Sequence, residues 1–206
     1  MLVAFYDLFR TGHLSWGWDF ANSDPPKCQL TEQGRRALQH LSRDPSNPDG
    51  YFAHLASRAT LNPIAGSYVD EALRAYNNDC FRAAAVMIGA AAESMILELR
   101  DIVEAGIKKQ GRTPAKELAH HLIKRVLDAL QKELQMQQRH MPTDLREAFD
   151  AYWSAFTQQI RTARNDAGHP ASIAPVTSDT VHASLLIFPE LAGLSKKLVE
   201  WATGHY

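Results

Sequence analysis

Residues 161–170, RTARNDAGHP, bring together side chains that could bind and cleave a phosphodiester. Arg164 offers planar paired donors that match phosphate oxygens, and it keeps its charge at every relevant pH. His169 titrates near neutral pH and can therefore move a proton. A metal-free ribonuclease needs these two roles, so Arg164 and His169 form a candidate catalytic pair.

The spacing of this pair sets a geometric condition. On an unbroken helix, five residues rotate by about 500° and rise by about 7.5 Å, which leaves the two side chains about 140° apart. They could not share one phosphate in that arrangement. Gly168 and Pro170 are typical of helix ends, and a proline disfavours the α conformation of the residue before it. The helix is therefore expected to unwind there, or a second copy of the chain to supply a partner.

A structural role for the same residues is the alternative. Arg35 and His40 also lie five positions apart, in a segment with no functional context. Cations near a helix C-terminus complement the helix dipole, which would explain Arg164 and His169 without any chemistry. Spacing alone does not separate the two hypotheses.

Three stretches of the chain resemble the HEPN superfamily (higher eukaryotes and prokaryotes nucleotide-binding). They are RNDAGHP at a predicted helix end, YNNDCFRAAAVMIGAAAESMILEL upstream of it, and LLIFPELAGL in the last predicted helix. The similarity covers about residues 63–203. The signature of the superfamily is Arg, a polar residue, a few further residues, and then His.

The resemblance implies a function and a set of partners. In that superfamily the motifs of two protomers meet at a dimer interface and form a metal-independent endoribonuclease site, often in toxin and antitoxin or phage-defence systems. It implies that Arg164 and His169 are catalytic, that Asn165 takes the polar position, and that Asp166 takes a more variable one. It also implies a homodimer that acts on RNA, with an antitoxin or a nucleotidyltransferase as a further partner. A non-catalytic relative that binds a nucleotide or a partner protein is the alternative.

Glu93 is the lone acid in the small-residue stretch AAAVMIGAAAE. Proteins related by the same resemblance often have an acid near this place. Glu93 could orient Arg164 or His169 and raise the basicity of the imidazole by hydrogen bonding. The alternative is a buried acid that pairs with a neighbouring arginine.

Hydrophobic periodicity predicts a helical domain over residues 61–206. Apolar residues recur at three and four positions, and Gly89 would let a neighbouring helix approach a central one. The predicted fold is mainly α, an HEPN-like antiparallel bundle of about five helices. The expected helices cover residues 63–76, 79–107, 113–134, 143–168 and 178–202.

Residues 1–60 differ in composition and predict a small mixed α/β module. Turn clusters surround short expected strands and one helix that begins after Thr31 and ends by Pro45. The words PPKCQLTEQGRRAL weakly resemble the wing and last helix of a winged-helix domain. Because no recognition helix is evident before the wing, a packing or partner-binding module is favoured over a DNA-binding regulator.

The composition limits the remaining function classes. With 22 Lys and Arg against 23 Asp and Glu, the net charge is -1, so RNA binding would have to rest on a local patch. Cys28 and Cys80 form no CxxC pair, and the histidines lack the spacing of a metal site, so no metal or cofactor is expected. No apolar run approaches the roughly 18 to 20 residues that span a bilayer, which favours a cytoplasmic protein without a membrane partner.

Overall fold

The computed structural model describes residues 2–17, 28–39, 43–162 and 176–206. Within these ranges the chain is mainly helical with one small sheet, which confirms the predicted class. The first elements are α1 (Leu2–Arg10), β1 (Leu14–Trp16), β2 (Cys28–Leu30), α2 (Glu32–Gln39) and α3 (Pro48–Arg58). The later ones are α4 (Pro63–Asn77), α5 (Phe81–Lys109), η1 (Lys116–Ala119), α6 (Ile123–Gln137), η2 (Gln138–His140), α7 (Thr143–Thr162) and α8 (Ser178–His205).

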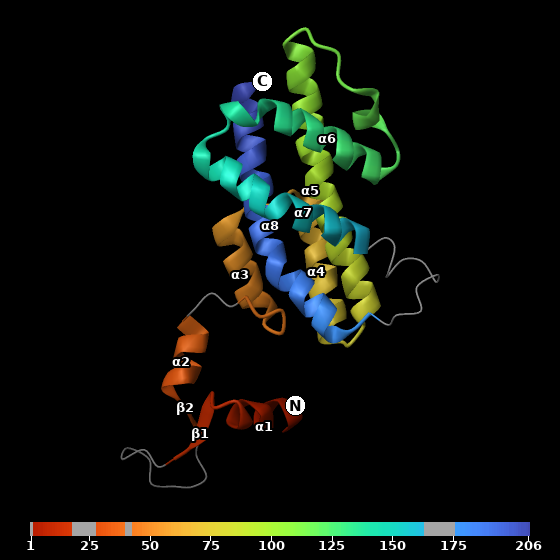
Figure 1. Cartoon of the computed structure of the whole chain (residues 1–206). Helices are drawn as coiled ribbons and strands as arrows, with labels where there is room; N and C mark the ends of the chain where they lie inside the picture. Colours follow the sequence, from red (N-terminus) through yellow and green to blue (C-terminus); the bar gives the residue numbers. More distant parts are fainter. Residues whose placement is uncertain (1, 18–27, 40–42, 163–175) are drawn as a thin grey trace.

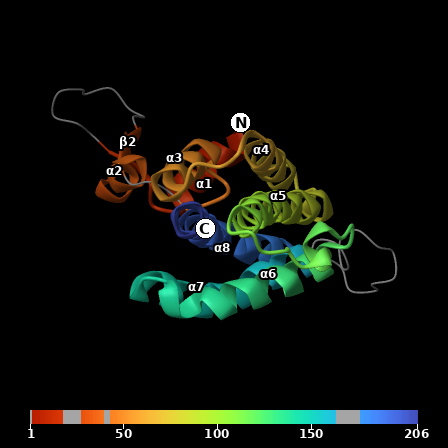
Figure 2. The ribbon, with the colours of Figure 1, turned by 90° about the horizontal axis from the view of Figure 1, so that it is seen from above.

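Six helices form three layers (Figure 1). Seen from above, α3 and α4 form one outer layer, α8 and α5 the middle layer, and α7 and α6 the other outer layer (Figure 2). The contacts agree, because α5 packs against α4, α6, α7 and α8, while α8 packs against α3, α5 and α7. The central position predicted for the small-residue helix is therefore confirmed.

The core is built from the apolar stripes that the periodicity predicted. In α5 the small residues alternate with larger ones along the buried faces, so its backbone can lie close to neighbours on both sides. The buried residues of this helix include Ala84, Ala85, Ile88, Gly89, Ala91, Ala92, Met95, Ile96, Leu99 and Val103. In α7, Phe149, Trp153, Phe156 and Ile160 are all at most 3% exposed.

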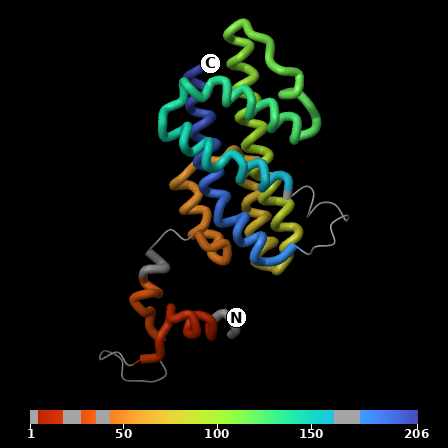
Figure 3. The backbone as a smooth tube through the Cα atoms, in the orientation of Figure 1, coloured from red at the N-terminus to blue at the C-terminus, as the bar shows by residue number. Residues whose placement is uncertain are grey.

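The middle helices run in the same direction. At one end Gly106 of α5 lies against Tyr206, and at the other the hydroxyl of Tyr76, which precedes α5, lies 2.9 Å from Nδ1 of His182 in α8. The C-terminus accordingly lies beside the far end of α5 (Figure 3). The expected antiparallel arrangement is therefore wrong for this pair, because α6 and α7 together carry the chain back before α8 begins.

The prediction that a helix begins at Thr113 is also wrong. Residues 116–119 form only a 3-10 turn, and the α-helix begins at Ile123. The imidazole Nδ1 of His120 accepts the backbone N–H of Leu122 at 3.0 Å, a local bond that competes with helix formation. Leu118 is buried, whereas Leu122, which was expected on the apolar stripe, is 46% exposed.

The N-terminal residues form more helix than the single one expected. The helix after Thr31 is present, and the Thr31 hydroxyl caps it by accepting the Gly34 N–H at 3.0 Å. β1 and β2 pair antiparallel, with α1 packed on β1 and α2 on β2. A helix, α1, thus does precede the strand pair, although it carries little positive charge.

α3 is a further unexpected helix, and it contacts the layered core. Its Tyr51 is fully buried, and the Tyr51 hydroxyl donates to the Leu185 carbonyl of α8 at 2.8 Å. α3 lies before the predicted boundary at residue 60 in the sequence, yet it packs against α8. The division into two domains stays a prediction.

Candidate functional site

The segment with the four candidate residues connects α7 to α8. Arg164, Asn165, Asp166 and His169 lie outside the residues that the structure describes, so their roles stay predictions. The structure describes the chain on either side of this segment, up to Thr162 and again from Val176.

The last turns of α7 are anchored in the core. Phe156 and Ile160 are 0% and 1% exposed, and the ring of Phe156 meets that of Trp153 edge to face at 6.3 Å between centroids. Gln159 is also buried. Arg161, on the last turn, is exposed. The core therefore fixes the end of α7 while leaving its terminal cation at the surface.

A groove of about 420 Å³ lies between this end of α7 and the first turns of α6. Its apolar lining comes from Leu122, Ile123, Leu127 and Ile160, and its polar lining from Lys124, Asp128, Gln131, Thr157 and Arg161. No side chain caps the N-terminus of α6 at Leu122. The groove therefore combines an apolar lining with two cations, and it adjoins the turn that leads to Arg164.

The start of α8 is held from the other side. The Thr177 hydroxyl caps the helix by accepting the Thr180 N–H at 3.3 Å, and Val181 is fully buried. The Tyr76 phenol contacts His182. Burial raises the pKa of this phenol, and nearby acids, chiefly Asp44, raise it further. Val176, the first described residue after the segment, lines a hollow together with Arg82 and its neighbours at the start of α5.

Glu93 lies on another groove, between α4 and α5. It is half-buried and lines a groove of about 960 Å³ together with Asn62, Ser94 and Glu98. The Asn62 amide donates to Glu98 at 2.8 Å, and the Ser94 hydroxyl donates to the Asn62 oxygen at 3.1 Å. Whether Glu93 orients Arg164 or His169 stays a prediction, because both partners lie outside the described residues.

The sequence did not reveal a buried polar cluster at the C-terminal end of the bundle. Glu133 is 7% exposed, and its two carboxylate oxygens accept from both Nη atoms of Arg112 at 3.1 and 3.2 Å. The Tyr206 hydroxyl donates to Glu133 at 3.0 Å, and burial together with this carboxylate raises the pKa of the phenol. Each oxygen of Glu133 has a partner, so the cluster ties α6 to the C-terminus. The sequence signal that could have revealed this cluster is Glu133, an acid among the apolar residues of α6.

The histidines and cysteines show no metal chemistry in the part of the chain that the structure describes. No three His, Cys, Asp or Glu side chains gather there in a way that could hold a metal ion. The rings of His120 and His121 stack at 4.3 Å, and His205 stacks on Trp201 at 4.6 Å. Both cysteines are free and exposed. Among the same residues, no helix has the length and apolar character needed to cross a membrane.

Comparison with known proteins gives no relative, because no protein family, curated protein or solved structure matches the chain. The chemistry of its own residues is therefore the basis for a function.

Proposed function

We propose that this chain is an HEPN-like, metal-independent endoribonuclease in which Arg164 and His169 cleave RNA. The observation that carries the proposal is the place of the Arg and His segment in the chain. It connects α7 to α8, and both helices are held by buried residues up to its two ends, at Ile160 and Val181. Anchored helices of this kind give the connecting segment two fixed ends.

The proposed reaction uses the nucleophile that RNA itself carries. His169 takes the proton of the 2′-hydroxyl, and the 2′-oxygen forms a bond to phosphorus while the bond to the 5′-oxygen breaks. A second His169 or a water protonates the leaving 5′-oxygen. Arg164 stabilises the charge that develops on the phosphorane oxygens. The products are a 2′,3′-cyclic phosphate and a 5′-hydroxyl.

The other residues and partners follow from the same proposal. Asn165 and Asp166 support the catalytic pair, and Glu93 is a candidate positioning residue. Two copies form the site, so the protein is a homodimer. Its proposed location is the cytoplasm. An antitoxin or a nucleotidyltransferase that controls the ribonuclease is the partner that this function would require in a toxin or defence system.

Cleavage of RNA in the presence of EDTA tests the function. We expect the purified protein to leave cyclic phosphate ends and to spare both DNA and 2′-O-methyl RNA. Arg164→Ala and His169→Ala should each lose about 100-fold or more in activity, the range of a lost acid or base, without a change in melting temperature. A requirement for magnesium, or cleavage of DNA, would contradict the mechanism.

A non-catalytic binding module is the second candidate, and the groove between α4 and α5 favours it. This groove is large and partly apolar, and Ile64 on its edge is 62% exposed. An exposed apolar surface of this kind is typical of protein binding. If the wild-type chain leaves every RNA intact under the conditions above, the binding module becomes the better explanation.

A further inference from the structure

The groove between α6 and α7 has an excess of positive charge. Lys124 and Arg161 both line it, and Asp128 is the one acid that does so among the described residues. In the described ranges, neither cation takes part in an ion pair, although Lys108, Arg112 and Lys197 each contact a carboxylate. Among the described residues, no direct partner therefore cancels the field of the two groove cations.

The groove between α4 and α5 has the opposite charge. It is lined by Glu93, Glu98 and Asp101. Its one described cation, Arg100, donates to Asp101 at 2.8 Å. α4 lies on one side of the middle layer, and α6 and α7 lie on the other (Figure 2). Although the chain as a whole is close to neutral, a polyanion would be drawn to the groove between α6 and α7 and repelled from the groove between α4 and α5.

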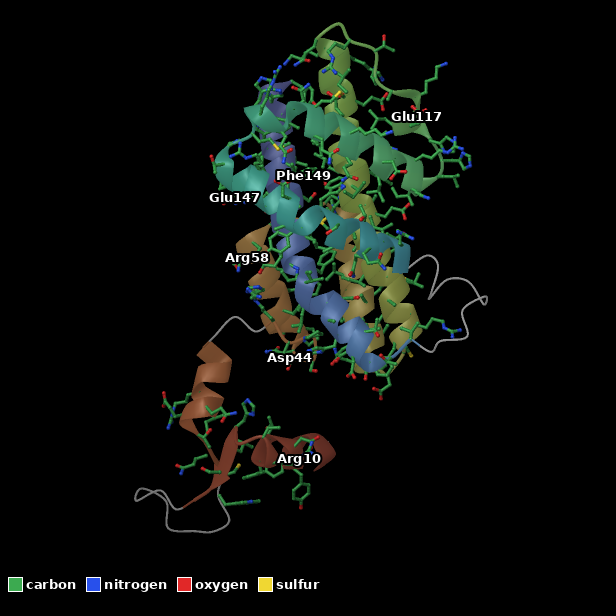
Figure 4. The ribbon with its side chains drawn as sticks, viewed as in Figure 1. Arg10, Asp44, Arg58, Glu117, Glu147 and Phe149 are labelled. Carbon is green, nitrogen blue, oxygen red and sulfur yellow. The ribbon has the colours of Figure 1, made fainter. Side chains whose placement is uncertain are left out.

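α6 carries two further cations beside this groove. Arg125 and Lys132 line a second groove of about 410 Å³ on the neighbouring side of this helix. The Arg125 guanidinium lies 3.3 Å from Nε2 of His120. Glu117, which Figure 4 labels beside α6, and Asp128 are exposed acids in the same groove. The cations of this second groove are thus balanced by acids, and the excess of positive charge stays with the groove between α6 and α7.

The apolar part of the groove suits a nucleobase. Leu122 is 46% exposed there, and Leu127 and Ile160 lie at the base of the same groove. Its volume of about 420 Å³ falls within the usual range of small-ligand sites, about 300 to 1,000 Å³. Apolar surface and two cations in one groove suit a base and the phosphates that flank it.

We infer that single-stranded RNA binds in this groove, with Lys124 and Arg161 on its phosphates, and continues toward the candidate catalytic segment. Arg161 precedes Arg164 by only three residues, so the groove lies at the end of α7 from which that segment starts. The inference rests on the proposed function, because it gives the substrate its path to Arg164 and His169.

Binding of a fluorescent, single-stranded 2′-O-methyl oligonucleotide of mixed sequence tests the groove, since this probe resists the proposed reaction. Lys124→Glu and Arg161→Glu should each weaken binding by about tenfold at low salt, and each should reduce the salt slope by about 0.7 for a lost phosphate contact. Lys109→Glu is the matched control, because Lys109 is also exposed and makes no ion pair among the described residues. Its affinity should remain that of the wild type.

The outcomes separate this inference from the proposed function. The inference that RNA binds in this groove would be overturned by equal binding of all three variants, by an equal loss in the control, or by no binding of the wild type. If unmodified RNA is not cleaved while probe binding depends on Lys124 and Arg161, the groove holds and the ribonuclease proposal fails. If RNA is cleaved and both groove variants keep the wild-type kcat/KM, the ribonuclease proposal is supported and RNA binding in the groove is contradicted.

Discussion

His54 is a buried histidine in a cationic environment. It lies on α3 and is 8% exposed, and its Nε2 atom has no hydrogen-bond partner among the described residues. Nearby, Arg43 and Arg58 both contact the Glu190 carboxylate of α8, at 2.9 and 3.4 Å. Figure 4 marks Arg58 on α3. Burial first, and then the two arginines, lower the pKa of His54, while Glu190 acts in the opposite direction.

This lowered pKa predicts a loss of stability in acid. The folded state binds the proton less readily than the unfolded chain, whose histidine pKa is about 6.5. The contribution of His54 is therefore complete above about pH 6.5 and is lost as the pH falls through the folded pKa. We expect His54→Phe, which removes the titration, to show a smaller fall in Tm between pH 7 and pH 5, by about 2 °C or more. Equal falls in both proteins would show that His54 does not titrate with unfolding.

The site residues differ in how far the sequence revealed them. Arg164 and His169 are close in the sequence, so residue type and spacing made them candidates, and the resemblance to the HEPN superfamily favoured chemistry over a structural role. Lys124 and Arg161 are 37 positions apart, and Lys124 belongs to no motif. Only the packing of α6 beside α7 brings them to one groove. A site assembled from distant helices leaves no local signal in a single sequence.

Helix starts show how local chemistry can mislead. Asn62 and Pro63 begin α4, and Asn47 and Pro48 begin α3, where Asn47 accepts the Gly50 N–H at 3.2 Å. The second pair was interpreted only as a turn. Thr113 with Pro114 offers a similar pair, but no α-helix begins there. A polar residue before proline is therefore compatible with both outcomes. After Pro114 the bond from the Leu122 N–H to His120 competes with helix formation.

Gly106 marks the closest approach between the ends of α5 and α8. A Cβ atom at this position would overlap Cβ and Cγ of Tyr206. We expect Gly106→Ala to displace Tyr206 and weaken its bond to Glu133, at a cost of about 1 to 3 kcal/mol, the usual range for overpacking. Urea denaturation would measure this loss.

Gly193 provides the matched control for that substitution. It also lies within a long helix, but a Cβ atom there would meet nothing within 4 Å. Gly193→Ala should therefore keep or raise the stability, by up to about 1 kcal/mol, because alanine favours the helix. Similar losses in both variants would mean that Gly106 is not limited by contact with Tyr206.

At the scale of the whole molecule, the sequence predicted which faces are buried but not which helices meet. The periodicity of α4, α5, α7 and α8 marked their apolar stripes correctly. The same stripes are compatible with several layer orders and helix directions, because burial of an apolar face is non-directional. The sequence therefore could not predict that α5 and α8 run parallel, or that the two grooves differ in charge.

The proposed homodimer makes the last prediction, which concerns the position of its two-fold axis. If the segment from Arg164 to His169 meets its copy, then Ser178, at the exposed start of α8, lies closer to its own copy than Thr203 at the other end. Along the helix these two positions are separated by about 37 Å. In a chain with both native cysteines changed to serine, Ser178→Cys should give a cross-linked dimer with a short bis-maleimide, and Thr203→Cys should not. A monomer by light scattering at micromolar concentration, or cross-linking only through Thr203→Cys, would place the motifs apart and remove the dimeric site, because an isologous interface must bring equivalent residues together around its axis.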